Sequence, residues 1–145
     1  MSVNSFNPLG VWKPFGAFSQ AVVQGSGKVI HLKGQVSLDR ERNVVGSGDI
    51  AKQVEQSLEN IRSILAVFGG KMEDIYSLTH HVTDIEAFME TGSIRNQYFK
   101  QPFPVTTTVE VSRLYNTELM VEITGSAEIP VSRYRKPQGS DTLDQ

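Results

Sequence analysis

The residue types best suited to chemistry in this chain alternate along two segments near its end, 104–113 and 119–126. Apolar side chains take every second position, which predicts two β-strands, each with one apolar and one polar face. We predict that the strands form a hairpin whose polar face carries Thr106, Thr108, Glu110, Ser112, Met120, Glu122, Thr124 and Ser126. A carboxylate in such a row can act as a general base when burial tunes its pKa, or serve only as a hydrogen-bond acceptor at an interface.

Metal-binding residues are few. The chain has no cysteine, which excludes disulfides, thiolate ligands and cysteine nucleophiles. His80 and His81 are neighbours in a predicted strand, so they point to opposite faces and cannot bind one ion together, and His31 belongs to another strand. We therefore expect no metal site.

Length and charge indicate an ordinary globular protein. A chain of 145 residues favours one domain over 1–145, with a core from about 14 to 128, a poorly ordered lead-in at 1–13 and a similar tail at 130–145. The net charge of -2 argues against nucleic acid, and Arg133, Arg135 and Lys136 are expected in a solvated tail rather than a basic patch. Neither a signal peptide nor a membrane span is predicted, so we expect a cytoplasmic protein.

The elements that must position the polar face follow from periodicity. Segments 17–23 and 28–32 are predicted as a first hairpin around a glycine-rich turn. Apolar residues spaced by three and four predict a helix from Ile50, capped by Asp49 and ended by Gly69-Gly70. A strand over 74–83 follows, and then a helical region that begins after Asp84 and is interrupted near Gly92.

The resulting order is β-β-α-β-α-β-β, which predicts an α+β two-layer fold: a mixed sheet with two helices on one face. The opposite face of the sheet is left open. Its threonine, serine, glutamate and methionine side chains are too polar for a core, and a sheet of this character often meets another subunit.

Several segments in order resemble the reactive-intermediate deaminase family, known as Rid or YjgF and once described as endoribonuclease L-PSP. The resemblance runs from about residue 14 to residue 128. The matching segments are 16–21, 33–36, 48–50, 56–61, 82–85, 98–99, 108–114 and 121–123.

This resemblance implies a chorismate-mutase-like fold and a homotrimer with a small-molecule cleft at each subunit interface. In active members an arginine pairs with the substrate carboxylate, and a glutamate helps to position the water that attacks an imine or enamine carbon. The products are a 2-keto acid and ammonia, and no cofactor is implied.

Carried over residue by residue, the resemblance implies only part of that site. The glutamate matches Glu122, the cleft glycine matches Gly34, and the aromatic residue, usually tyrosine, matches Phe18. Lys33 stands where serine or threonine is usual, and Gly92 stands where the family has asparagine. The arginine is replaced by Thr106, and Thr108 holds a position that is often cysteine, serine or threonine.

Threonine cannot replace arginine as a carboxylate ligand, because it lacks both the charge and the fork of donors. Lys33 is the one new positive charge among the matched positions. It either supplies the lost charge or extends into solvent at the rim of the cleft. Arg95, in the second helical region, either occupies an ordinary surface position or reaches a neighbouring subunit.

Three functions remain open. The first is hydrolytic deamination of an imine or enamine metabolite, with Glu122 orienting water. The second is a non-catalytic trimer that binds a metabolite or a partner protein. The third is the ribonuclease activity of some relatives, which the slightly acidic charge supports least.

Overall fold

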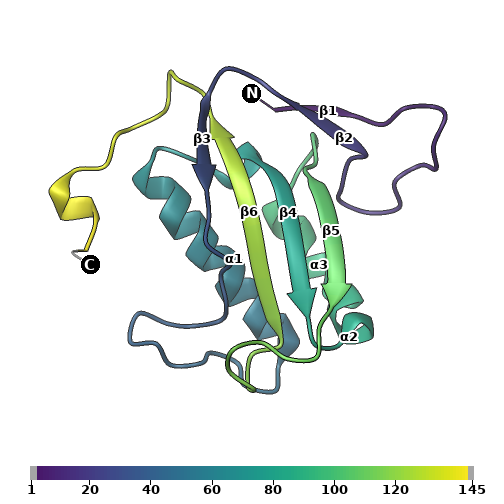
Figure 1. The fold of residues 1–145 in the computed structure, drawn as a ribbon, viewed down its shortest axis with the longest axis vertical. Helices are drawn as coiled ribbons and strands as arrows, with labels where there is room; N and C mark the ends of the chain where they lie inside the picture. The colour runs from purple at the N-terminus through teal and green to yellow at the C-terminus, as the bar shows by residue number, and fades with distance from the viewer. Residues whose placement is uncertain (1–2, 144–145) are drawn as a thin grey trace.

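The computed structural model describes residues 3–143, so the outermost residues of the expected lead-in and tail lie outside it. A four-stranded sheet has the order β3-β6-β4-β5, and a two-stranded sheet pairs β1 with β2. The strands are β1 (Val3–Phe6), β2 (Ala21–Gln24), β3 (Lys28–His31), β4 (Ile75–Val82), β5 (Val105–Glu110) and β6 (Val121–Ile129). Figure 1 looks onto the larger sheet, with the helices behind it.

Helix α1 (Ile50–Val67) confirms the periodicity argument. The Asp49 carboxylate accepts a hydrogen bond from the backbone N–H of Lys52 at 3.1 Å, and Gly69 ends the helix with φ of 76°. The second helical region is divided as expected, into α2 (Ile85–Met89) and α3 (Gly92–Tyr98). Short 3-10 turns at Met72–Asp74 and Gly139–Asp141 complete the elements, η1 and η2.

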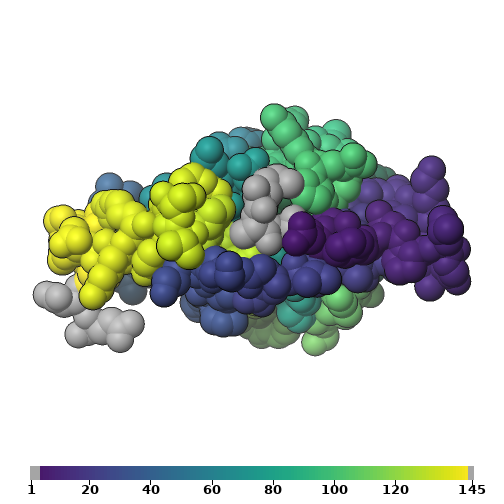
Figure 2. Space-filling view, turned by 90° about the horizontal axis from the view of Figure 1, so that it is seen from above, coloured from purple at the N-terminus to yellow at the C-terminus, as the bar shows by residue number. Residues whose placement is uncertain are grey.

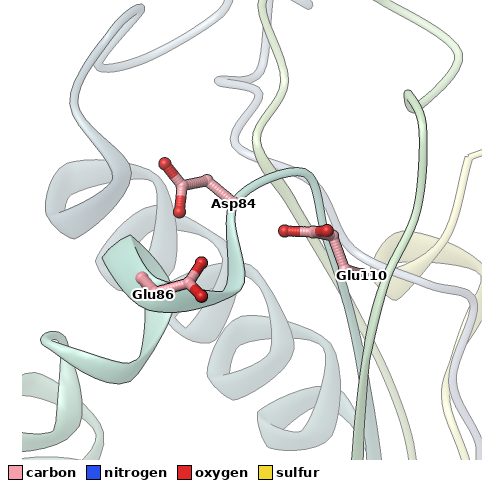
Figure 3. Close-up of side chains that lie close together, drawn as sticks. All are labelled: Asp84, Glu86 and Glu110. Atoms are coloured by element: carbon pink, nitrogen blue, oxygen red, sulfur yellow. The ribbon is translucent and has the colours of Figure 1, made fainter.

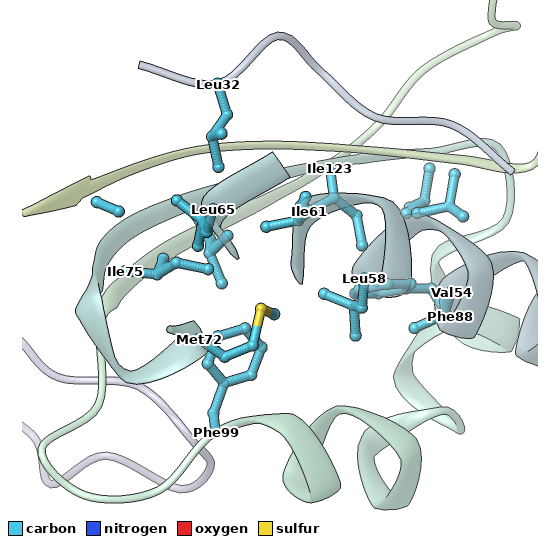
Figure 4. Close-up of a cluster of buried hydrophobic side chains, with 14 residues drawn as sticks. Leu32, Val54, Leu58, Ile61, Leu65, Met72, Ile75, Phe88, Phe99 and Ile123 are labelled. Atoms are coloured by element: carbon cyan, nitrogen blue, oxygen red, sulfur yellow. The ribbon is translucent and has the colours of Figure 1, made fainter. Parts of the chain in front are cut away.

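The core lies between α1 and the sheet. Leu58, Ile61 and Leu65 of the helix are fully buried and meet Ile123 and Ala127 of β6 in one cluster (Figure 4). Along β6 the odd-numbered residues are buried and Glu122, Thr124 and Ser126 are half-buried, which confirms the expected alternation in this strand. The two-layer α+β prediction is therefore confirmed.

Both predicted hairpins are wrong. β4 lies between β5 and β6; it pairs parallel with β5 and antiparallel with β6. β2 pairs with β1, whereas β3 pairs with β6. Alternation determines which residues of a strand share a face, but the neighbouring strand is chosen by long-range packing, and here the mostly buried β4 takes the central place.

The loop between β1 and β2 and the C-terminal segment after β6 extend to opposite ends of the molecule (Figure 2, purple and yellow). The N-terminal segment crosses beside β5, where the Ser5 and Ser19 hydroxyls both donate to the carbonyl of Phe103, at 2.8 and 2.7 Å. None of the helices within residues 3–143 combines the length and apolar character needed to cross a bilayer.

Candidate functional site: two half-sites on opposite faces of the sheet

A cavity of about 510 Å³ lies between β5, the helices α2 and α3, and the N-terminal segment. We call it the helix-side cavity. It gathers four of the residues that the sequence singled out: Phe18, Gly92, Thr106 and Thr108. Its remaining lining is mostly apolar or aromatic: Trp12, Phe15, Gly16, Ala17, Ile85, Met89, Arg95 and Asn96.

Thr106 and Thr108 face the helices, not the open side of the sheet. In the parallel pairing of β4 with β5 they stand opposite Leu78 and His80, two buried residues of the helix-side face. The prediction that they share a face with Glu122 is therefore wrong. Strand β5 is an edge strand, and it turns its exposed Val109 outward while its hydroxyls line the cavity.

His80 supports the cavity from behind. Its Nδ1 lies 3.0 Å from the Thr108 hydroxyl, and its ring packs beside Phe88 at a centroid distance of 4.9 Å. Burial, and then the positive charge of Arg95 and the proximity of His81, lower the pKa of His80 from 6.5 to about 3. The ring is therefore neutral at physiological pH and serves as a hydrogen-bond partner for Thr108 rather than as a charge.

Arg95 forms part of the cavity wall, which the sequence left open as a surface position or a subunit contact. Its guanidinium carbon lies 4.4 Å from the centroid of the Phe88 ring. Its Nε is buried without a hydrogen-bond partner, and burial lowers the pKa of the guanidinium. Periodicity could not find this role, because Arg95 lies in a short helix without buried residues.

Aromatic side chains of the N-terminal segment close the cavity on another side. Trp12 stacks on Phe15 at 5.6 Å, and Phe15 meets Phe18 edge-on at 5.2 Å between ring centroids. Trp12 and Phe15 nevertheless remain 59% and 78% exposed. The sequence indicated only Phe18, through the family resemblance, and missed its two partners.

The other three predicted residues, Lys33, Gly34 and Glu122, line a shallow groove of about 1110 Å³ at the edge of the sheet, which also contacts α1 through Ser63, Ile64 and Val67. We call it the open-face groove, because Glu122 belongs to the half-buried row of β6 that faces away from the core. The segment after β3 continues alongside β6. The backbone N–H of Gln35 donates to the carbonyl of Ile123 at 2.8 Å, and the Ile123 N–H donates back at 2.9 Å.

Gly34 is needed here for its lack of a side chain. A Cβ atom at this position would lie 2.9 Å from Glu122 Cγ and Cδ and 2.9 Å from the Thr124 hydroxyl oxygen. Glycine thus allows the Glu122 carboxylate to lie against the backbone at the rim of the groove.

The seven predicted site residues thus form two separate groups within one protomer, with Thr106 and Glu122 on opposite faces of the sheet. Phe18, Gly92, Thr106 and Thr108 belong to the helix-side cavity, and Lys33, Gly34 and Glu122 to the open-face groove. Since Lys33 and Thr106 are in different groups, one protomer alone does not bring the lysine to the threonine.

Three carboxylates approach one another at the start of α2: Asp84, Glu86 and Glu110, with oxygens within 4.8 Å (Figure 3). Two of them cap the helix. Asp84 accepts from the N–H of Ala87 and Glu110 from the N–H of Ile85, both at 3.0 Å. All three are exposed; capping accounts for Asp84 and Glu110, and Glu86 is an acidic residue of the first helical turn, where the helix dipole favours it.

The α+β fold is that of a known class of small proteins. A Rid-family protein of unknown function from Yersinia pestis superposes with a TM-score of 0.76 at 26% identity, covering 89% of this chain and all of the other. Rv2704 of Mycobacterium tuberculosis, a member of the YjgF/YER057c/UK114 family, gives 0.62 at 27% identity, with 88% and 100% covered.

The model of the endoribonuclease L-PSP family matches residues 11–129, so the chain belongs to this family, also called Rid or YjgF. A RutC family protein of Pyrococcus abyssi is 34% identical over 102 residues, which is 70% of this chain and 79% of the relative. The human 2-iminobutanoate/2-iminopropanoate deaminase is 31% identical over 99 residues, 68% of this chain and 71% of the relative.

Proposed function

We propose that three copies of the chain pack their open sheet faces together, so that the groove of one subunit meets the helix-side cavity of its neighbour. The half-buried polar row of β6 and the exposed Val109 of β5 support such packing, since a face of this character is suited to an interface. Each cleft of the trimer then contains all seven predicted residues.

The proposed reaction is hydrolysis of a C=N bond in a small imine or enamine metabolite. Water adds to the carbon, the carbon–nitrogen bond breaks, and the products are a carbonyl compound and ammonia. Glu122 orients the water and accepts its proton, while the cavity residues hold the substrate. Two relatives are named 2-iminobutanoate/2-iminopropanoate deaminase, the human protein and one from Dermatophagoides farinae.

The observation that carries this proposal is the packing of Glu122 against Gly34, because it fixes a carboxylate at the rim of the groove and not in free solvent. The replacement of arginine by Thr106 favours a second candidate, a trimer that binds a metabolite without turnover. Both candidate functions predict the same trimer, so they are distinguished by whether the protein hydrolyses an imine substrate.

Ammonia release from 2-iminopropanoate and 2-iminobutanoate, generated in situ, tests the function. We expect the wild type to accelerate release, and Glu122→Gln to lower the rate about 100-fold or more. Glu118→Gln is the matched control, since this exposed glutamate lies outside both sites and its side chain accepts a hydrogen bond from the Ser47 hydroxyl at 3.0 Å. No acceleration by the wild type contradicts the deaminase and leaves the binding role.

Light scattering on the full chain tests the assembly separately. We expect the mass of three copies of the 16.1 kDa chain. Gly34→Ala should displace Glu122 and lower the rate while the mass stays unchanged, because the added methyl group meets side-chain atoms at 2.9 Å. A monomer in solution contradicts the proposed clefts.

A further inference from the structure

The helix-side cavity contains a positive charge that the sequence comparison did not assign. Thr106 stands where related deaminases are expected to carry an arginine, and Arg95 lines the same cavity from α3. The charge therefore reaches the cavity from the helix wall and not from the strand wall.

Arg95 has no charged or hydrogen-bonding partner among the described residues. Its guanidinium makes no hydrogen bond and no ion pair with any other residue in 3–143, and its Nε is buried without a partner. By contrast, Arg62, Arg133 and Arg135 each bond a carboxylate at 2.9 Å or less. A partly desolvated cation without a partner is costly in a folded protein and attracts an anion.

The environment of Arg95 holds it in a defined position. Its guanidinium carbon lies over the ring of the fully buried Phe88, 4.4 Å from the centroid, so the group is anchored against the core. A planar fork held in this way is suited to a carboxylate, which it can bind through two parallel hydrogen bonds. The Thr106 and Thr108 hydroxyls on the opposite wall add neutral hydrogen-bonding groups.

The rest of the cavity indicates what the carboxylate is attached to. Phe18, Trp12 and Phe15 form one aromatic wall, and Ile85 and Met89 of α2 add aliphatic surface. Such a lining favours a large apolar substituent over the methyl or ethyl group of the smallest 2-imino acids.

We propose that Arg95 binds the substrate carboxylate in place of the missing strand arginine, and that the ligand is a 2-imino or 2-oxo monocarboxylate with a bulky apolar side chain. This inference rests on the proposed function for its substrate class. It competes with Lys33, an exposed residue of the open-face groove, which reaches the cavity only from a neighbouring subunit.

Calorimetric titration of the assembled wild-type protein with phenylpyruvate, a stable 2-oxo acid, tests the proposal without turnover. We expect Arg95→Met to weaken binding about 100-fold, as for loss of a desolvated charge contact. The matched control Arg62→Met removes an exposed arginine outside both sites and should bind as the wild type does, whereas Lys33→Met tests the competing charge. Pyruvate should bind more weakly than phenylpyruvate, and phenylacetone, which lacks the carboxylate, should bind equally weakly to wild type and Arg95→Met.

A rescue variant separates the loss of a ligand contact from damage to the fold. Thr106→Arg in the Arg95→Met background returns an arginine to the strand wall, so it should restore much of the affinity for phenylpyruvate. Unchanged affinity in Arg95→Met, a loss confined to Lys33→Met, or no binding by the wild type each overturns the proposal.

Failure of this inference and failure of the proposed function give different results. Binding of phenylpyruvate through Arg95 without ammonia release contradicts only the proposed deaminase activity. Ammonia release with the same KM in wild type and Arg95→Met contradicts only the proposed role of Arg95 in binding the substrate carboxylate.

Discussion

Two regions of the molecule hold a partly buried arginine, and they treat its charge in opposite ways. Beyond β6, Arg133 donates to both oxygens of Asp74, at 2.6 and 2.8 Å, and to the carbonyl of Gly69 at 2.8 Å. Hydrogen bonding to Asp74 raises the pKa of Arg133. At the helix-side cavity, burial lowers the pKa of Arg95, and none of the described carboxylates pairs with it.

The difference shows how a structural charge is told from a ligand-binding one. Asp74 is 3% exposed and also accepts from the Lys71 N–H at 2.7 Å, so the Arg133 pair ties the segment after β6 to the turn before β4. Arg95 contacts the Phe88 ring but makes no hydrogen bond or ion pair that links two segments within residues 3–143. Its burial is a cost to the folded protein that only a ligand or a neighbouring subunit can offset.

The largest expected effect on stability comes from breaking the ion pair between Arg133 and Asp74. Asp74→Asn should lower the free energy of unfolding by about 3 kcal/mol, because it leaves Arg133 without its charged partner. Urea unfolding of wild type and variant measures the change. A loss below about 0.5 kcal/mol would show that the Arg133–Asp74 pair contributes no more than an ordinary surface pair, and would contradict its structural role.

The next effect concerns pH and the histidine behind the cavity. The pKa of His80 is about 3 in the folded protein and 6.5 when unfolded, so the unfolded state takes up the proton first as pH falls. The neutral His80 therefore contributes to the free energy of unfolding above pH 6.5, and this contribution is lost as the pH falls toward 3. Between pH 7 and pH 5 the loss is about 2 kcal/mol.

Unfolding by urea at several pH values measures this loss. His80→Asn should show a shallower decline between pH 7 and pH 5 than the wild type, since both share the titration of all other groups. Parallel curves for the two proteins would mean that His80 does not resist protonation in the fold.

Removing the charge of Arg95, which has no ion-pair partner among the described residues, should have a smaller effect on stability, and of opposite sign. Arg95→Met should stabilise the protein by up to about 1 kcal/mol, because it removes a partly buried cation and keeps apolar contact with Phe88. The same urea measurement applies, with Arg95→Lys as the charge-retaining control. A marked destabilisation by Arg95→Met would assign Arg95 a structural role like that of Arg133.

The smallest expected effect on stability comes from an exposed ion pair on α1. Arg62 donates to Glu59 at 2.9 Å, and their side chains are 52% and 41% exposed. Arg62→Met should change the free energy of unfolding by about 0.5 kcal/mol or less, and less again at high salt. A larger loss would show that exposure does not separate the pairs as we argue.

Comparison of sequence and structure shows which features are local. Helix α1 was predicted with its first residue and its cap, because Asp49, the apolar period and Gly69 act within a few residues of one another. The inward and outward residues of β6 were predicted for the same reason. For β5 the alternation was right but the face was wrong, since an edge strand can line a cavity with its polar residues.

The candidate site divides in the same way. Resemblance in the sequence singled out Phe18, Thr106, Thr108 and Gly92, which the structure brings into one cavity, and Gly34, Lys33 and Glu122, which it brings into one groove. It did not indicate that Thr106 and Glu122 lie on opposite faces of the sheet. Nor could it find the cavity role of Arg95, which depends on α3 packing beside β5.

The sequence by itself determined the family, the order of the elements from β2 onward and the identity of the carboxylate that faces away from the core, because caps, periods and motifs depend on neighbours along the chain; it did not predict β1 (Val3–Phe6), which lies in the expected lead-in. Only the tertiary structure decided that β4 separates β5 from β6, and that Arg95 shares a cavity with Thr106. Strand order and cavity walls depend on burial between segments far apart in the chain, and no local pattern records which distant surface a residue will meet.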